Sequence, residues 1–195
     1  MKMLPVLQIA AAIGLSLFAP LSHSSAQQPA NPEELRKLCE TILCRKPGLV
    51  RLTLDSGKPF ETRFDSPLPI VQNEWVSIYP GETIFVEAEA SGDHLINLRA
   101  VATNDHPEKT LTFQFSQDAG APNMMLTVTN PFEKRVKYHA GMMLPTGDKL
   151  LKTSSCPVLG GGRMAFESWP NAIFQLVLFD FRLLDEGGQQ MACEF

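Results

Sequence analysis

Residues 169–184 read WPNAIFQLVLFDFRLL, and this stretch decides the fold. Between Ile173 and Phe179 every position except Gln175 is apolar, which predicts a segment covered on both faces. The pattern then alternates, so Phe179, Phe181 and Leu183 are expected to point to one face of the strand, and Asp180 and Arg182 to the other. The run is too short to span a membrane and is bounded by turn residues, so it predicts a central β-strand.

Shorter alternating runs predict the neighbours of this strand. The clearest turn is Asp55-Ser56-Gly57-Lys58, a hairpin signal between runs at 49–54 and 59–64. Other predicted strands cover residues 83–90, 95–102, 111–116, 124–129 and 135–142. In the first of these, Glu87 and Glu89 are expected to point outward, and Ile84, Val86, Ala88 and Ala90 inward.

The link from Pro145 to Arg163 is predicted to be irregular. Its Gly160-Gly161-Gly162 run lacks a following helix, so a mobile loop is favoured over a phosphate-binding cradle. Residues 164–169 are expected to lead directly into the central strand.

About eight short strands separated by turn signals predict a single antiparallel β-sandwich with a short N-terminal helix. Asn130-Pro131, between two alternating strands, resembles the bend seen in many bacterial immunoglobulin-like domains. The resemblance covers about twenty residues, so it implies an immunoglobulin-like fold and no function.

The N-terminal helix is predicted from its start signals. Asn31 is a helix-capping residue, Pro32 suits the first turn, and Glu34 lies three residues after the cap. An apolar stripe follows, which predicts about three turns of helix and comprises Leu35, Leu38, Cys39, Ile42 and Leu43.

The first 26 residues have the features of an export signal. Lys2 supplies a positive charge, an apolar stretch follows, and Ser24-Ser25-Ala26 places small residues before a cleavage point. We therefore expect a signal peptide at 1–26, a leader and helix at 27–48, and a β-sandwich domain at 49–195. Cleavage would leave no membrane span, and the protein would reside in the periplasm or be secreted.

All four cysteines lie in the part expected to be exported, where disulfides are favoured over catalytic thiols. Cys39 and Cys44 can pair locally only if the helix ends before Cys44, and the alternative is that each reaches elsewhere. We favour the local pair, with Cys156 and Cys193 as the second disulfide.

The net charge and the absence of familiar motifs make two classes of function less favoured, nucleic-acid binding and catalysis. Removing residues 1–26 takes away one lysine and no acidic residue, so the formal charge goes from −4 to −5. An acidic balance disfavours nucleic acid as a partner. The sequence contains no familiar catalytic or nucleotide-binding motif, so no catalytic or cofactor-binding residue is assigned and a non-enzymatic protein is expected.

The methionines offer one metal hypothesis. His139, Met142 and Met143 lie on one predicted strand near Met124 and Met125, and thioether with imidazole is a ligand set that Cu(I) prefers. Against this, methionine is ordinary core filler, and His139 shares its face with Arg135 and Lys137. No metal site is therefore favoured, and a periplasmic copper carrier using these three residues is the alternative.

Two other groupings have ordinary structural explanations. Glu87 and Glu89 are expected to lie on a solvated strand face instead of forming an acid–base or calcium site. Trp75, Tyr79 and Trp169 are candidates for an aromatic binding patch, but Trp169 beside Pro170 is expected to be packed.

The leading hypothesis is therefore an exported β-sandwich that binds another protein of the bacterial cell envelope, as an assembly subunit, an inhibitor or immunity protein, or a chaperone-like module. A hydrolase is the further alternative, and it would need a histidine beside a carboxylate and a hydroxyl or thiol.

Overall fold

The structure of the protein is a computed structural model that describes residues 31–185 and residue 193. The predicted export signal at residues 1–26 lies outside the described residues. One helix and fourteen strands occur in the described part: α1 (Pro32–Leu38), β1 (Cys44–Arg45), β2 (Gly48–Thr53), β3 (Pro59–Phe64), β4 (Leu68–Pro69), β5 (Val71–Gln72), β6 (Trp75–Ile78), β7 (Thr83–Ser91), β8 (His94–Val101), β9 (Thr110–Gln117), β10 (Met124–Asn130), β11 (Arg135–Met143), β12 (Leu151–Thr153), β13 (Arg163–Trp169) and β14 (Gln175–Leu184).

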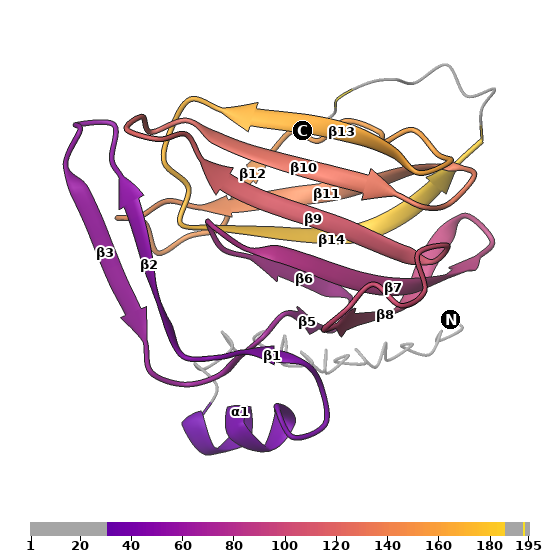
Figure 1. Cartoon of the computed structure of the whole chain (residues 1–195), viewed down its shortest axis with the longest axis horizontal. Helices are drawn as coiled ribbons and strands as arrows, with labels where there is room; N and C mark the ends of the chain where they lie inside the picture. Colours follow the sequence, from indigo (N-terminus) through magenta and orange to yellow (C-terminus); the bar gives the residue numbers. More distant parts are fainter. Residues whose placement is uncertain (1–30, 186–192, 194–195) are drawn as a thin grey trace, which may run out of the picture. The chain divides into compact units, whose positions relative to one another are not determined.

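Ten of these strands form one antiparallel sheet, and β14 lies in its interior as predicted (Figure 1). The strand β14 pairs with β11 on one side, and with β6 and then β8 on the other. The rest of the sheet continues from β8 through β7, β9 and β10 to β13. The predicted mainly β, sandwich-like fold is confirmed.

The sheet bends over to enclose its core. The Phe113 ring on β9 contacts Tyr138 on β11 and Phe181 on β14, although β9 pairs with neither strand. The inward residues of β9 and β10 are buried almost completely: Leu111, Phe113, Phe115, Met124, Leu126 and Val128. Burying side chains of this size stabilises a fold by about 1.5 to 3 kcal/mol each.

The predicted hairpin forms a separate two-stranded sheet of β2 and β3, which Figure 1 shows beside the main sheet. Gly57 in its turn has a φ of 76°, the left-handed conformation that favours glycine. The hairpin packs through Phe60 and Phe64, whose rings contact Phe174 and Tyr79 respectively.

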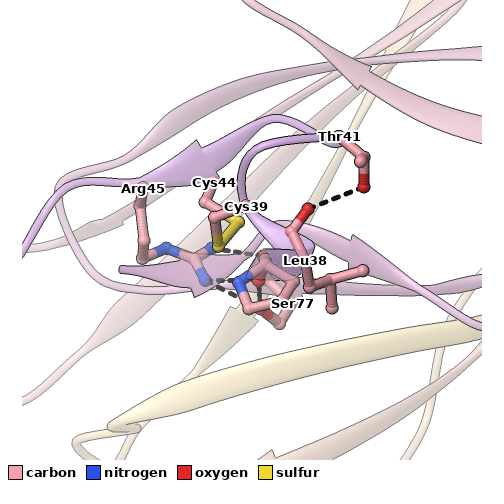
Figure 2. The surroundings of a disulfide bond; sticks show 7 residues. Leu38, Cys39, Thr41, Cys44, Arg45 and Ser77 are labelled. Atoms are coloured by element: carbon pink, nitrogen blue, oxygen red, sulfur yellow. Dashed lines mark hydrogen bonds between the residues drawn. A yellow bond between two sulfur atoms is a disulfide. The ribbon is translucent and has the colours of Figure 1, made fainter. Parts of the chain in front are cut away.

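The N-terminal helix begins as predicted, because the Asn31 side chain accepts a hydrogen bond from the Glu33 N–H. It is shorter than the predicted three turns and ends at Leu38, where the Thr41 hydroxyl donates to the Leu38 carbonyl. This early end lets Cys39 pair with Cys44, so the favoured local disulfide is present (Figure 2).

Arg45 fixes the segment that follows this disulfide. Its buried guanidinium forms an ion pair with Glu82 at 2.7 Å and donates to the Ser77 hydroxyl and to backbone carbonyls, as Figure 2 shows in part. It also lies 4.7 Å from the centre of the Tyr79 ring. A buried charge is tolerated when its donors are used in this way.

The second predicted disulfide, Cys156–Cys193, is also present. Beside it, the Glu167 carboxylate on β13 accepts hydrogen bonds from the Tyr138 hydroxyl at 2.8 Å and from the Cys156 N–H at 3.0 Å. Glu167 thereby connects both halves of the bent sheet to the link. Burial is the main cause that raises the pKa of Glu167 above its ordinary value of 4.5.

The three glycines of the link contact the loop that follows β10. Gly161 and Gly162 donate hydrogen bonds to the Phe132 and Asn130 carbonyls, so these N–H groups are not available to an anion. A Cβ atom on Gly160 would lie 1.9 Å from the Glu133 carbonyl oxygen. The run therefore lets the link approach the preceding loop closely. The link also contains the short strand β12, which was not predicted.

The buried Asn130 amide organises the same region. Its side-chain nitrogen donates toward the Lys134, Val158 and Leu159 carbonyls, and its side-chain oxygen accepts from the Phe132 N–H. The Asn130-Pro131 bend is thus fastened to the link from inside.

Two strand predictions were wrong in detail. Residues 169–184 are not one strand, because β13 ends at Trp169, pairs with β10 at the far end of the sheet, and is followed by a crossing segment before β14. Ala90 is exposed and Glu87 is buried, because the β7–β8 register shifts between Glu87 and Glu89 and because Arg99 and Lys109 cover the Glu87 carboxylate.

We expect Gly160→Ala to lower the free energy of unfolding by at least about 2 kcal/mol, because the added methyl group meets backbone that cannot move aside easily. Gly162→Ala is the matched control. Its Cβ meets nothing within 4 Å, so only its φ of +75° is unfavourable, at about 1 kcal/mol. Urea unfolding of both variants tests the difference, and equal losses would contradict the close approach.

A second prediction concerns Glu167. Because its pKa is raised in the folded state, stability should fall as pH rises from 4.5 through that raised value. Glu167→Gln keeps the acceptor oxygen and removes the charge, so this fall should disappear. Glu167→Leu should lose about 2 kcal/mol through unpaired hydrogen-bonding groups. Unfolding curves at pH 4 and pH 7 measure both effects, with Glu61→Gln in the exposed Arg51–Glu61 pair as control.

Candidate functional site

Three rings form a row across three neighbouring strands on the outer side of the sheet. Phe179 on β14 lies opposite His139 on β11, and it stacks between that imidazole and the Trp75 indole on β6. The ring centres are 5.1 Å apart for Trp75–Phe179 and 5.7 Å apart for His139–Phe179. Trp75 is 48% exposed, so the row ends in an aromatic ring that faces solvent.

A β-bulge in β14 creates this row. His139 lies opposite Phe179, whereas Lys137 lies opposite Arg182, so β14 has one residue more than β11 over this span. Asp180 occupies the bulge with a φ of 54°, which is uncommon for a residue other than glycine. The extra residue turns Phe179 outward while Leu178 and Phe181 stay buried. The prediction that Phe179 and Phe181 point to the same face was therefore wrong.

Asp180 is the electrostatic centre of the surface. Its carboxylate lies 2.7 Å from Arg182 Nη2, 3.2 Å from His139 Nε2 and 3.9 Å from His94 Nε2. The hydrogen bond from Arg182 is the main cause that holds the pKa of Asp180 below its ordinary value of 3.8. The ionised carboxylate therefore has cationic or cation-forming groups on several sides.

Arg182 belongs to a second row of polar side chains. Its register partners are Lys137 on β11 and His94 on β8. His94 Nδ1 in turn lies 2.7 Å from Asp93 Oδ1, and this contact holds the pKa of Asp93 below its ordinary value. We call the two rows together the Trp75 surface, whose central members are Trp75, His94, His139, Phe179, Asp180 and Arg182.

A pocket of about 300 Å³ adjoins the Trp75 surface at its His139 end. It lies between β11, β12 and β14, and its lining residues are His139, Ala140, Lys152, Thr153, Phe179 and Asp180. The Trp75 surface thus combines the exposed Trp75 ring, the Arg182 guanidinium and an adjoining pocket.

The three residues of the copper hypothesis do not come together on this surface. Strand alternation places Met142 on the face opposite His139, and Met142 packs against the hydrophobic core. His139 and Met143 share a face, but His139 already contacts Asp180 and Phe179. In the described part of the chain, no three His, Cys, Asp or Glu side chains are arranged to hold a metal ion.

The paired carboxylates of β7 each have a partner. Glu87 contacts Arg99 at 2.6 Å and Lys109 at 3.4 Å, and the hydrogen bond from Arg99 is the main cause that lowers its pKa. Burial of this carboxylate acts to raise its pKa, but the groups that cover it are the cationic side chains of Arg99 and Lys109. The net effect is therefore a lowered pKa. Glu89 accepts a hydrogen bond from the Asn97 side chain.

The predicted aromatic patch divides between surface and core. Tyr79 is buried against Phe64 and Phe174, and the Trp169 indole donates to the Thr153 hydroxyl while packing against Phe115. Trp75 alone of the three joins the exposed surface. The β14 bulge has no distinctive sequence signal, so the sequence did not reveal that Phe179 and Asp180 belong to the same site.

The three histidines in the described part of the chain contact carboxylates. His94 and His139 face Asp180, and His106 lies 3.8 Å from Glu108. Among the described residues, none of the three hydrogen-bonds a hydroxyl or a thiol. The arrangement can bind and orient a charged or aromatic group, and no activated nucleophile is present within it.

Comparison with known proteins gives no assignment, because no protein family model, curated protein or solved structure matches this chain. No helix in the described residues has the length and apolar character of a membrane span.

The arrangement around Asp180 yields a pH prediction. The pKa of Asp180 is lower in the folded state than its ordinary value of 3.8. The ionised carboxylate therefore stabilises the fold above pH 3.8, and this contribution is lost as the pH falls through the pKa of the folded state. In Arg182→Met the pKa of Asp180 should rise toward 3.8, so less stability is lost on acidification. Carboxyl NMR titration measures the pKa of Asp180, and urea unfolding at pH 2.5 and pH 7 measures the stability lost on acidification. Arg51→Met, at an exposed ion pair on the hairpin, should leave the pKa of Asp180 unchanged.

Proposed function

We propose that this protein is an exported, non-enzymatic β-sandwich that binds another protein through the Trp75 surface. The observation that carries the proposal is the Trp75–Phe179–His139 row, which presents an exposed indole on three paired strands. Tryptophan, tyrosine and arginine dominate the binding energy of protein interfaces. Trp75 and Arg182 supply two of these residue types on one face.

The position of the rings favours binding further. Strands β14 and β11 are paired along their lengths, so Phe179 and His139 are fixed before any partner arrives. Pre-ordered side chains lose little conformational entropy on binding. Strain at the Asp180 backbone is consistent with a functional site, because such conformations gather where a fold positions binding groups.

The cellular setting proposed is the bacterial periplasm or the secreted fraction. The two disulfides support an oxidising compartment, and the sequence of residues 1–26 supports export. The partner is a protein of the cell envelope, which this protein would serve as an assembly subunit, an inhibitor or immunity protein, or a chaperone-like module. Within residues 31–185, no group of side chains is arranged in favour of the copper carrier or the hydrolase.

The test is capture of a stoichiometric partner from the envelope fraction of the producing cell, followed by affinity measurement with the purified partner. Trp75→Ala and Arg182→Ala should each weaken binding at least about thirty-fold, as expected for central interface residues. Leu49→Ala is the matched control, because Leu49 is an exposed apolar residue on the separate hairpin sheet. Unchanged affinity in Trp75→Ala would contradict the proposed surface.

A further inference from the structure

The pocket that adjoins His139 has a floor of paired backbone. Ala140 on β11 lies opposite Thr153 on β12, and both residues are buried. The next pair along, Gly141 with Lys152, therefore faces outward. Lys152 is exposed, and His139 stands on the same outer face of the sheet. The pocket of about 300 Å³ thus lies between an ammonium group and an imidazole.

The carboxylate that lines this pocket already has its partners. Arg182 donates to both oxygens of Asp180, through Nε at 3.1 Å and Nη2 at 2.7 Å. His139 Nε2 lies 3.2 Å from the same carboxylate. Lys152, by contrast, forms no ion pair with any residue of the range 31–185. The pocket is therefore locally positive, on a chain whose formal charge is −4.

The Phe179 ring favours an anion over a cation in this pocket. Its two faces stack against the Trp75 indole and the His139 imidazole, with ring planes inclined by 24° and 27°. A cation binds to the face of an aromatic ring. The edge of the ring carries partial positive charge, and the edge is the part of Phe179 that the stack leaves open.

We propose that this pocket binds a carboxylate of the partner protein, held between Lys152 and His139 at the edge of Phe179. The inference rests on the proposed function, because it names the chemistry that the partner brings to the Trp75 surface. Carboxylates are the anionic groups that a protein partner supplies at neutral pH.

The imidazole makes this binding depend on pH. His139 Nε2 faces a carboxylate, which only accepts hydrogen bonds, so the neutral ring has its hydrogen on Nε2 and leaves Nδ1 as an acceptor. After protonation both nitrogens donate, so Nδ1 can bind the partner's carboxylate while Nε2 stays with Asp180. The charged or titratable groups around the imidazole are Asp180 and Arg182 on β14, Lys152 on β12, Lys137 on β11 and His94 on β8.

The first experiment is an NMR titration of the exported, purified full protein with phenylacetate at pH 5.5. We expect a Kd of about 1 mM, a reasonable affinity for a ligand of about ten non-hydrogen atoms. Resonances of His139 and Phe179 should shift. The neutral phenylacetamide and the cationic benzylamine should bind at least about five-fold more weakly. Equal binding of benzylamine, or tighter binding of inorganic phosphate, would overturn the proposal.

The second experiment removes the ammonium group. Lys152→Gln should weaken phenylacetate binding by about two- to five-fold, as expected for the loss of one exposed ion pair. Lys58→Gln, at the exposed turn of the hairpin, is the matched control and should leave the affinity unchanged. An equal effect of the two substitutions would contradict the proposed role of Lys152.

The third experiment follows the affinity for phenylacetate from pH 5.5 to pH 8. Binding should weaken by about two- to five-fold, because histidine loses its charge over this range. His139→Gln should remove this dependence, whereas His106→Gln, beside Glu108 in another loop, should retain it. A native protein whose affinity is the same at both pH values would refute the role of the imidazole.

The carboxylate can come from an acidic side chain or from the end of the partner's chain. Two probes distinguish these sources. Acetyl-phenylalanyl-glycine carries a chain-end carboxylate, and acetyl-phenylalanyl-aspartyl amide carries a side-chain carboxylate. The tighter probe identifies the source, and either preference supports the proposal. Binding of neither probe would overturn it.

A last comparison separates this pocket from the proposed function. Lys152→Gln should also weaken binding of the envelope partner by about two- to five-fold. Failure of phenylacetate to bind, with Trp75-dependent capture intact, would overturn only the carboxylate pocket. Binding of phenylacetate without any Trp75-dependent partner would support the pocket and contradict the proposed function.

Discussion

One extra residue in the central strand determines how this protein presents its surface. A strand without the bulge would bury alternate residues throughout, and Phe179 would then point the same way as Phe181. The bulge at Asp180 shifts the alternation by one position, which keeps the buried residues of both halves of β14 inside. On the outer side of the sheet, the bulge places two consecutive side chains, Phe179 and Asp180, next to each other at the surface. Core packing and surface chemistry therefore depend on the same local irregularity.

Polar side chains hold the irregular parts of the chain to this sheet. Arg45 fixes the N-terminal segment through Glu82 and Ser77. Gln117 holds the hairpin, because its side-chain amide both accepts from the Thr53 N–H and donates to the Thr53 carbonyl, as a neighbouring strand would. Glu167 holds the link. Each contact replaces strand pairing at a place where the chain leaves the sheet.

The predictable part of the structure was the part governed by local periodicity. The hairpin at 49–64 followed from its turn residues, and the disulfides followed from export and cysteine spacing. The bulge could not be predicted, because 176–179 are apolar at every position and fit either alternation. Glu87 looked solvated because the sequence does not show that Arg99 and Lys109 meet it across the sheet. The close approach of the glycine run could not be predicted, because the backbone it approaches lies 27 residues earlier, at Glu133. Non-local contacts account for these failures.

The buried Asn130 amide has a chemical consequence that arises from its neighbour in the chain. Asparagine commonly ages to aspartate when the next backbone nitrogen attacks the side-chain carbonyl and forms a cyclic imide. Pro131 has no backbone N–H to lose in that cyclisation, so this route is blocked. Conversion would be damaging here, since a carboxylate would face three carbonyl oxygens that now share the amide hydrogens. The Asn-Pro pair thus protects the loop against slow deamidation over the lifetime of the molecule.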